Sequence, residues 1–235
     1  MLTSRAKNYL RAVRQHGLAA SSVQYWNRLR EKLFDRSLGI QSRDIISLRE
    51  LGLEHEERRG HYPTSVDDFR RMAGFLRPRN ADEVLLDYGS GLGRFVILAA
   101  TMPFARIIGV ELSPLLAEGA RSNISSCERS LLCKDIEIII ADATGYDVPD
   151  DVTTIYFNYP FAGAILESVL GRIVASYKEK PRPLRIVCNL PQESAFFNMM
   201  QKADQFLLDK QLDLGAHRRC CVFSIKKSQL ISIND

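Results

Sequence analysis

The sequence lacks the features that mark several common protein classes. Its five cysteines include no C-x-x-C pair, so neither a zinc site nor a disulfide framework is indicated. No apolar run reaches the roughly 20 residues of a membrane-spanning helix. The first 20 residues are basic and hold no apolar signal-peptide core. We therefore expect a cytoplasmic protein with reduced thiols, no metal site and no membrane association.

Acidic residues are scarce in the first third of the chain. Residues 1–80 carry 16 Lys and Arg against 9 Asp and Glu, whereas the remainder carries 16 against 19. Such a basic region can contact nucleic acid, or it can be the solvated face of amphipathic helices. No arginine-rich block or interleaved aromatic array accompanies it. Nucleic acid is therefore not the favoured partner, and we expect the region to pack over the site or build a homodimer.

The chain is predicted to divide into a helical extension, residues 1–59, and a larger domain, residues 60–235. Apolar residues recur at helical spacing in residues 4–16 and again in residues 21–34. The Ser21-Ser22 pair can cap the second of these helices.

The end of the extension is expected to be less regular. Residues 43–51 predict a short element, and residues 54–60 read as a charged linker without an apolar anchor. Beyond it, Tyr62 and Thr64 precede a helix whose apolar face runs from Val66 to Leu76, and this segment can serve simply as a capped start of that helix.

The centre of the chain is a glycine-rich turn. Residues Val84–Asp87 have β-strand character and run into Gly89, Gly91 and Gly93, after which a helical run begins at Phe95. This strand, turn and helix start is the layout of a nucleotide-binding βα unit. Glycines suit such a turn because they let the backbone approach a ligand closely.

Asp87 indicates which ligand the turn would bind. A carboxylate beside the glycines would repel a pyrophosphate but would suit a ligand that carries an ammonium group. Arg94 also stands where a dinucleotide fingerprint has its last glycine. The string D-Y-G-S-G-L-G resembles motif I, D-x-G-x-G-x-G, of the class I methyltransferases that use S-adenosylmethionine. An ordinary tight βα turn is the alternative.

From Glu83 onward, strand and helix alternate, which predicts a doubly wound α/β fold with a mostly parallel sheet. The predicted elements are strands over 84–87, 106–111, 136–140, 153–157 and 184–188, helices over 95–102, 114–126, 162–177 and 193–203, and two final strands over 205–212 and 219–226 joined through Gly215. The resemblance implies a seven-stranded sheet of order 3-2-1-4-5-7-6 whose last strand is antiparallel.

Acidic residues stand at the ends of three successive strands, the edge at which α/β sheets bind ligands. Asp87 is the first. Glu111 follows the second strand, about 22 residues after Gly89, and can accept both hydroxyls of a ribose, with Leu112 against an adenine. Asp142 and Ala143 follow the third strand, where the carboxylate can accept from the adenine amino group. Alternatively, Glu111 is only an acidic residue at a helix N-terminus.

The string F-N-Y-P-F follows the fourth strand. It is similar to the [DN]-P-P-[FYW] motif of amino-methyltransferases, although Tyr159 replaces the first proline. The longer F-N-Y-P-F-A-G-A-I-L-E-S-V-L looks more like the segment of the non-SET histone-lysine methyltransferases and their bacterial relatives. This resemblance implies that Asn158 orients the methyl acceptor and contacts the cofactor, while Tyr159 and Phe161 form an aromatic wall. An Asn-x-Pro turn without function is the alternative.

Together these resemblances imply an S-adenosylmethionine-dependent methyltransferase that releases S-adenosylhomocysteine. They also imply that Tyr62 and Thr64 cover the methionine end of the cofactor. The acceptor would be an amine or another nucleophile on a protein or small molecule. Two alternatives remain, a nucleic-acid methyltransferase and a cofactor-binding module without activity. No general base is identified, because a lone histidine such as His61 is more often structural.

Overall fold

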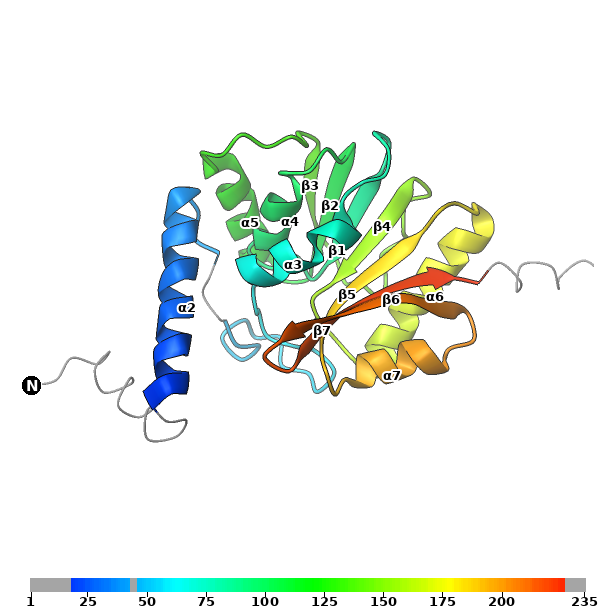
Figure 1. Ribbon diagram of the computed structural model, residues 1–235. Helices are drawn as coiled ribbons and strands as arrows, with labels where there is room; N and C mark the ends of the chain where they lie inside the picture. Colours follow the sequence, from blue (N-terminus) through cyan, green and yellow to red (C-terminus); the bar gives the residue numbers. More distant parts are fainter. Residues whose placement is uncertain (1–17, 43–45, 227–235) are drawn as a thin grey trace, which may run out of the picture.

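The computed structural model describes residues 18–42 and 46–226 of the chain (Figure 1). Their core is a seven-stranded sheet of order β3-β2-β1-β4-β5-β7-β6. Strands β1 to β5 pair in parallel, whereas β7 runs antiparallel to both of its neighbours. The predicted fold class, strand order and antiparallel last strand are therefore confirmed. The strands are β1 Val84–Tyr88, β2 Arg106–Glu111, β3 Ile136–Ile140, β4 Val152–Phe157, β5 Arg185–Pro191, β6 Phe206–Gly215 and β7 Arg218–Ile225.

Helices cover both faces of the sheet, as the core contacts and Figure 1 show. One face carries α3 Val66–Leu76, α4 Arg94–Ala99 and α5 Pro114–Ser126; the other carries α6 Gly163–Glu179 and α7 Ala195–Lys202. Among the described residues, we find no helix whose length and apolar character would let it cross a membrane.

Alternation along the central strand explains the two layers. Val84, Leu86 and Tyr88 pack with the α6 and α7 side, whereas Leu85 packs with the α3, α4 and α5 side. Successive side chains of a strand point to opposite faces, and a central parallel strand is buried on both. Asp87 shares the face of Leu85, so its carboxylate emerges beside α4 at the end of the strand.

The hairpin that ends the sheet differs in detail from its prediction. Strand β6 is longer than predicted, whereas β7 has the predicted length but begins and ends one residue earlier. The turn that joins them is Ala216-His217, directly after Gly215, which is the last residue of β6. Ala216 and His217 have φ angles of +48° and +60°. Positive φ at both central residues is the hairpin turn whose twist matches that of the strands. Its sequence signal was missed because neither residue is Gly or Asn.

The N-terminal extension was predicted less well. Helix α2 spans Leu18–Ser37, so the Ser21-Ser22 pair lies within the helix and the predicted cap is wrong. The preceding Ala19 and Ala20 are strong helix formers, which favours an earlier start. Residues 46–51 form turns and a single bridge from Ile46 to His61, not a helix or strand. The predicted helix over residues 4–16 lies outside the described residues.

Residues 54–60 are not an unanchored linker, because polar contacts hold them on the sheet domain. The Glu57 carboxylate accepts hydrogen bonds from the backbone N–H groups of Ala164 and Ile165, at 2.9 and 3.1 Å. It thereby caps the N-terminus of α6 from another part of the chain, and these bonds lower the pKa of Glu57. The anchor is polar, so apolar periodicity gave no sign of it. The division at residue 59 stays a prediction.

Candidate functional site

One cavity lies at the carboxyl ends of β1 to β4. It encloses about 970 Å³, a volume that includes its open mouth. Most of the residues proposed from sequence line it: Tyr62, Thr64, Asp87, Gly89, Gly91, Glu111, Leu112, Asp142, Ala143, Asn158 and Phe161. Gly93 and Tyr159 are not among its lining residues. The fold thus brings residues from five separate segments to one site.

The glycine-rich turn needs its glycines for two different reasons. Gly89, Gly91 and Gly93 have φ angles of +74°, +56° and +77°, which side chains disfavour. A Cβ on Gly91 would also collide with the imidazole of His61, which lines the same cavity. A Cβ on Gly93 would lie 3.0 Å from that of Ala120 on α5. Gly93 therefore allows α4 and α5 to pack closely, while Gly91 shapes the cavity wall.

Asp87 and Glu111 form an acidic pair in the cavity wall. Asp87 is 2 % exposed, and no described residue donates a hydrogen bond to its carboxylate. Burial raises the pKa of Asp87 well above its usual range, and the nearby Glu111 carboxylate raises it further. Such a carboxylate is costly to ionise alone, and a cationic group in the cavity would favour its charged form.

Glu111 organises the turn as well as facing the cavity. Its carboxylate accepts hydrogen bonds from the backbone N–H groups of Gly91, at 2.8 Å, and Ser113, at 2.9 Å. Burial raises the pKa of Glu111, and these backbone donors oppose the rise. Each carboxylate oxygen has two lone pairs, so both oxygens can still accept from a ligand hydroxyl.

Asp142 is more exposed than the other two acids. It accepts hydrogen bonds from the backbone N–H and the hydroxyl of Thr144, at 2.9 and 2.7 Å, and pairs with Arg58 at 3.4 Å. The Thr144 hydroxyl is the main reason that the pKa of Asp142 is lowered. Asp142 therefore offers a carboxylate that stays ionised, beside Leu112 and Ala143 in the cavity wall.

The N-Y-P-F segment presents only part of itself to the cavity. Asn158, Pro160 and Phe161 line it, whereas Tyr159 has a φ of +50° and lies under the guanidinium of Arg59, 5.2 Å from the ring centre. The aromatic wall thus has Phe161 but not Tyr159. The Tyr159 ring instead contacts the segment that crosses the site.

That segment, residues 53–64, is called the strap. Its backbone pairs with the N-Y-P-F segment, since the N–H of Arg59 donates to the carbonyl of Pro160 at 3.0 Å. Asn158 donates to the carbonyl of Tyr62 at 2.7 Å, and the hydroxyls of Thr64 and Tyr156 lie 3.0 Å apart. Tyr62 is exposed and Thr64 buried, so the strap closes one side of the cavity.

Sequence reasoning missed several lining residues in the extension. Leu48, Leu51 and Leu53 line the cavity together with Arg58 and His61. Three leucines within six residues were a weak signal of burial, but their spacing fits neither helix nor strand. Their position depends on how residues 46–53, bridged to the strap through Ile46 and His61, fold back over the sheet.

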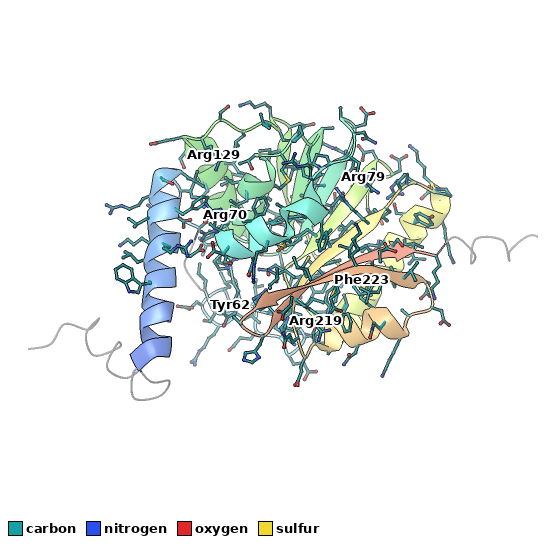
Figure 2. The ribbon with its side chains drawn as sticks, in the orientation of Figure 1. Tyr62, Arg70, Arg79, Arg129, Arg219 and Phe223 are labelled. Carbon is teal, nitrogen blue, oxygen red and sulfur yellow. The ribbon has the colours of Figure 1, made fainter. Side chains whose placement is uncertain are left out.

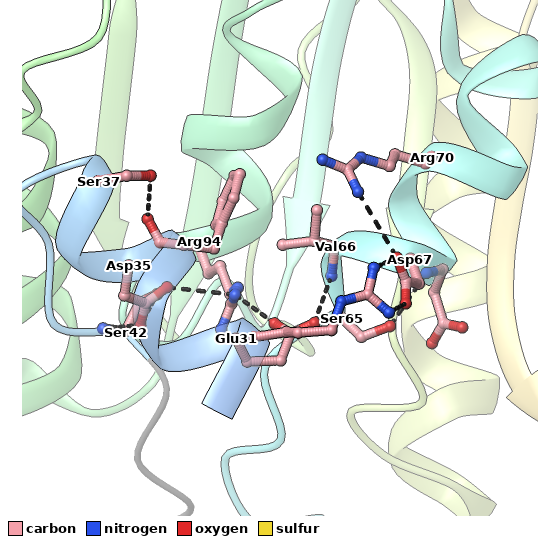
Figure 3. A network of polar contacts seen from close by, with 12 residues as sticks. Glu31, Asp35, Ser37, Ser42, Ser65, Val66, Asp67, Arg70 and Arg94 are labelled. Atoms are coloured by element: carbon pink, nitrogen blue, oxygen red, sulfur yellow. Dashed lines mark hydrogen bonds and ion pairs between the residues drawn. The ribbon is translucent and has the colours of Figure 1, made fainter. Parts of the chain in front are cut away.

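Arg94 ties the helix of the extension to the glycine-rich turn (Figure 3). Its guanidinium is 2 % exposed, pairs with Glu31, and lies 3.2 Å from Asp35. Glu31 also accepts from the backbone N–H of Val66, at 3.2 Å, and so caps α3. Helix α2 is therefore joined to α3 and α4 by buried charges. In the sequence, this contact was indicated only by an arginine at the position where a dinucleotide fingerprint has its last glycine.

The described residues contain no group of three or more His, Cys, Asp or Glu side chains that could hold a metal ion. All five cysteines are free thiols, and four of them are buried. Most long charged side chains lie on the outside of the molecule, as Arg70, Arg79 and Arg129 do in Figure 2.

Solved structures share this architecture. An RNA methyltransferase from Salinibacter ruber, in complex with S-adenosyl-L-homocysteine, is 24 % identical over 71 % of this chain and 94 % of its own, with a TM-score of 0.50. A SAM-dependent methyltransferase from Thiobacillus denitrificans, also with S-adenosyl-L-homocysteine, is 14 % identical over 78 % and 100 %, with a TM-score of 0.52.

A ribosomal protein L11 methylase from Lactobacillus delbrueckii subsp. bulgaricus is 16 % identical over 70 % of this chain and 81 % of its own, with a TM-score of 0.53. No protein-family model matches the chain, and no curated protein sequence is significantly similar to it. Likeness at these identities shows a shared fold.

Proposed function

We propose that this chain, which has the fold of S-adenosylmethionine-dependent methyltransferases, is itself such an enzyme. The observation that carries the proposal is the acidic pair Asp87 and Glu111 beside a glycine-rich turn in one cavity. Asp87 is buried without a hydrogen-bond donor among the described residues. A dinucleotide would bring a pyrophosphate to this turn, which the Asp87 carboxylate disfavours.

The cavity residues fit the parts of S-adenosylmethionine. Asp87 would pair with the ammonium of the methionine end, and Glu111 would accept from the ribose hydroxyls. Leu112 and Ala143 would lie against the adenine, with Asp142 accepting from its amino group. Tyr62 and Thr64 would cover the methionine end. Gly89 and Gly91 would allow close approach of the backbone, while Gly93 keeps α4 and α5 in place.

The bound cofactor supplies a methyl group that its sulfonium activates for transfer. The protein must align the acceptor, exclude water and leave the acceptor deprotonated. Asn158 would orient the acceptor, and Phe161 would form the apolar wall. An amine loses its proton more readily in such surroundings because desolvation disfavours the charged form. Tyr159 would act at a distance, by holding the strap through Arg59.

The favoured acceptor is an amine or another nucleophile on a protein or small molecule, as the resemblance to bacterial relatives of the non-SET histone-lysine methyltransferases implies. Nucleic acid is the second candidate, because the region up to residue 80 is basic and one similar structure is an RNA methyltransferase. The free cysteines fit the cytoplasm as the place of action.

Calorimetry of the full chain with S-adenosylmethionine, S-adenosylhomocysteine and NAD tests the cofactor. We expect the first two to bind and NAD not to bind. Incubation with methyl-labelled S-adenosylmethionine and separate protein, nucleic-acid and metabolite pools then identifies the acceptor class. Tight NAD binding without any response to S-adenosylmethionine would contradict the proposal.

A further inference from the structure

Arg218 contacts the candidate acceptor residue Asn158 from β7, which lies two strands away from β4 in the sheet. It is the first residue of β7 and directly follows the Ala216-His217 turn. Its Nη2 donates to Oδ1 of Asn158, at 3.0 Å, and its Nε donates to Oδ1 of Asn189, at 3.1 Å. One guanidinium thus joins the ends of β4, β5 and β7.

The position of Arg218 does not depend on Asn158. Asn189 is fully buried on β5, and the carboxylate of Asp68 in the first turn of α3 lies 3.7 Å from Nε of Arg218. The side chain of Asp68 is 16 % exposed, which limits screening of the pair by solvent. Asn189 and Asp68 therefore hold Arg218 in place on the inner side, and Asn158 is the more exposed partner that it contacts.

The partners of Asn158 fix which way its amide points. Arginine can only donate hydrogen bonds, and the carbonyl of Tyr62 can only accept them. Oδ1 must therefore face Arg218, and Nδ2 must face the strap carbonyl at 2.7 Å. If the amide were flipped, both hydrogen bonds would be lost, because Nδ2 would face the donor of Arg218 and Oδ1 would face the carbonyl of Tyr62. Asn158 thus keeps one carbonyl lone pair and one N–H in a fixed direction.

We propose that Arg218 is a positioning residue, which acts on methyl transfer by fixing the orientation of the Asn158 amide at the cavity wall. This inference rests on the proposed function, in which Asn158 aligns the acceptor. Arg218 itself is not among the residues that line the cavity. Its substitution should therefore alter alignment while leaving the cofactor contacts intact.

The side-chain amide signal of Asn158 gives a test that needs no acceptor. The signal is assigned in ¹⁵N NMR spectra of the full chain as the one that Asn158→Ala removes. Arg218→Met should shift this signal and speed its hydrogen exchange. Arg219→Met is the matched control, because Arg219 points to the other face of the strand and stacks on Phe197, 4.3 Å from the ring centre. An Asn158 signal unchanged in Arg218→Met would overturn the proposal.

Arg218→Lys is a second variant that keeps the test decisive if Arg218→Met fails to fold. Its compact ammonium keeps the charge but lacks the planar fork through which Nη2 and Nε of Arg218 donate to Asn158 and Asn189 in fixed directions. The Asn158 signal should therefore shift again, with the unfolding temperature close to that of the wild type. A lysine variant with the wild-type signal would equally overturn the proposal.

A double-mutant cycle tests the effect on turnover, with the acceptor pool that the wild type labels. Arg218→Met should lower turnover on the order of tenfold or more, by analogy with misplaced catalytic groups, while affinity for S-adenosylhomocysteine stays within a few-fold. In the Asn158→Ala background it should cost nothing further, because the group on which it acts is gone. Additive losses would overturn the proposal. If the wild-type protein transferred methyl label to none of the pools, that result would count against the proposed function instead. The NMR test of Arg218 does not depend on methyl transfer.

Discussion

The guanidinium of Arg94 lies 3.2 Å from the carboxylate of Asp35, where the N-terminal helix meets the first helix after the glycine-rich turn. Glu31 pairs with the same guanidinium and caps α3. The extension is thus part of the structure that supports the candidate cofactor site.

Removal of the Arg94 charge should strongly destabilise the fold. Arg94→Gln leaves Glu31 and Asp35 without their cation, and breaking a buried ion pair in this way typically costs about 3–5 kcal/mol. Urea unfolding of the full chain measures the loss. Lys180→Gln breaks an exposed pair with Asp150 and should cost far less, because solvent screens the attraction between exposed charges. Equal losses of unfolding free energy in the two variants would show that the buried Arg94 pairs contribute no more to stability than an exposed pair.

Asp87→Asn should stabilise the cofactor-free chain and weaken cofactor binding. Because the folded pKa of Asp87 is raised, its contribution to stability is fully present below its unfolded pKa of about 3.9. That contribution is lost as the pH rises through the folded pKa. Asparagine removes this loss, so the unfolding temperature at neutral pH should rise. Asp204→Asn, on an exposed loop, is the control and should leave both properties unchanged.

The same reasoning predicts how cofactor binding depends on pH. An ammonium ligand binds the ionised Asp87, so affinity for S-adenosylmethionine should rise as the pH rises towards the folded pKa. Calorimetry in buffers of different ionisation enthalpy should detect protons released on binding. A pH-independent affinity, with no proton release, would show that Asp87 does not bind the ammonium group of the cofactor.

Glu111→Ala should weaken binding of S-adenosylmethionine by roughly 1–3 kcal/mol, because ligand hydroxyls lose a charged acceptor. The N–H of Gly91 loses its partner as well, so the turn itself should loosen. Calorimetry measures the affinity. Glu118→Ala changes an exposed residue of the following helix and should bind as the wild type does. Unchanged affinity in Glu111→Ala would place the ribose elsewhere.

Asn158→Ala should cost catalysis far more than binding. Alignment matters chiefly in the transition state, so turnover should fall on the order of a hundredfold while cofactor affinity stays within a few-fold. Asn198→Ala, exposed on α7, controls for loss of an amide elsewhere. Full turnover in Asn158→Ala would make N-Y-P-F a structural turn.

The basic N-terminal region should not bind nucleic acid strongly. Binding driven by phosphate contacts weakens steeply with salt, so we expect no shift of DNA or RNA by the full chain at near-physiological salt. A chain that starts at residue 18 is the control, because it keeps Glu31 and Asp35. A salt-sensitive shift that this truncation abolishes would instead favour a nucleic-acid acceptor.

The sequence by itself determined the sheet and the acidic strand ends. The strand Val84–Asp87 and its glycines are a local pattern, and the carboxyl ends of parallel strands meet at one edge. Asp87, Glu111 and Asp142 could therefore be placed together from their positions in the chain alone. The helix over Pro114–Ser126 was predicted with its observed bounds, since Ser113 and Pro114 mark its start locally.

Only the tertiary structure decided what surrounds those residues. Three polar contacts join segments far apart in the sequence: the ion pair of Arg94 with Asp35, the capping of α6 by Glu57 and the hydrogen bond from Arg218 to Asn158. Each depends on how helix α2, the strap or the final hairpin packs against the rest of the domain, and no periodicity within one segment encodes that arrangement. Polar contacts of this kind are selected by distance and angle in the folded chain, so they become visible only there.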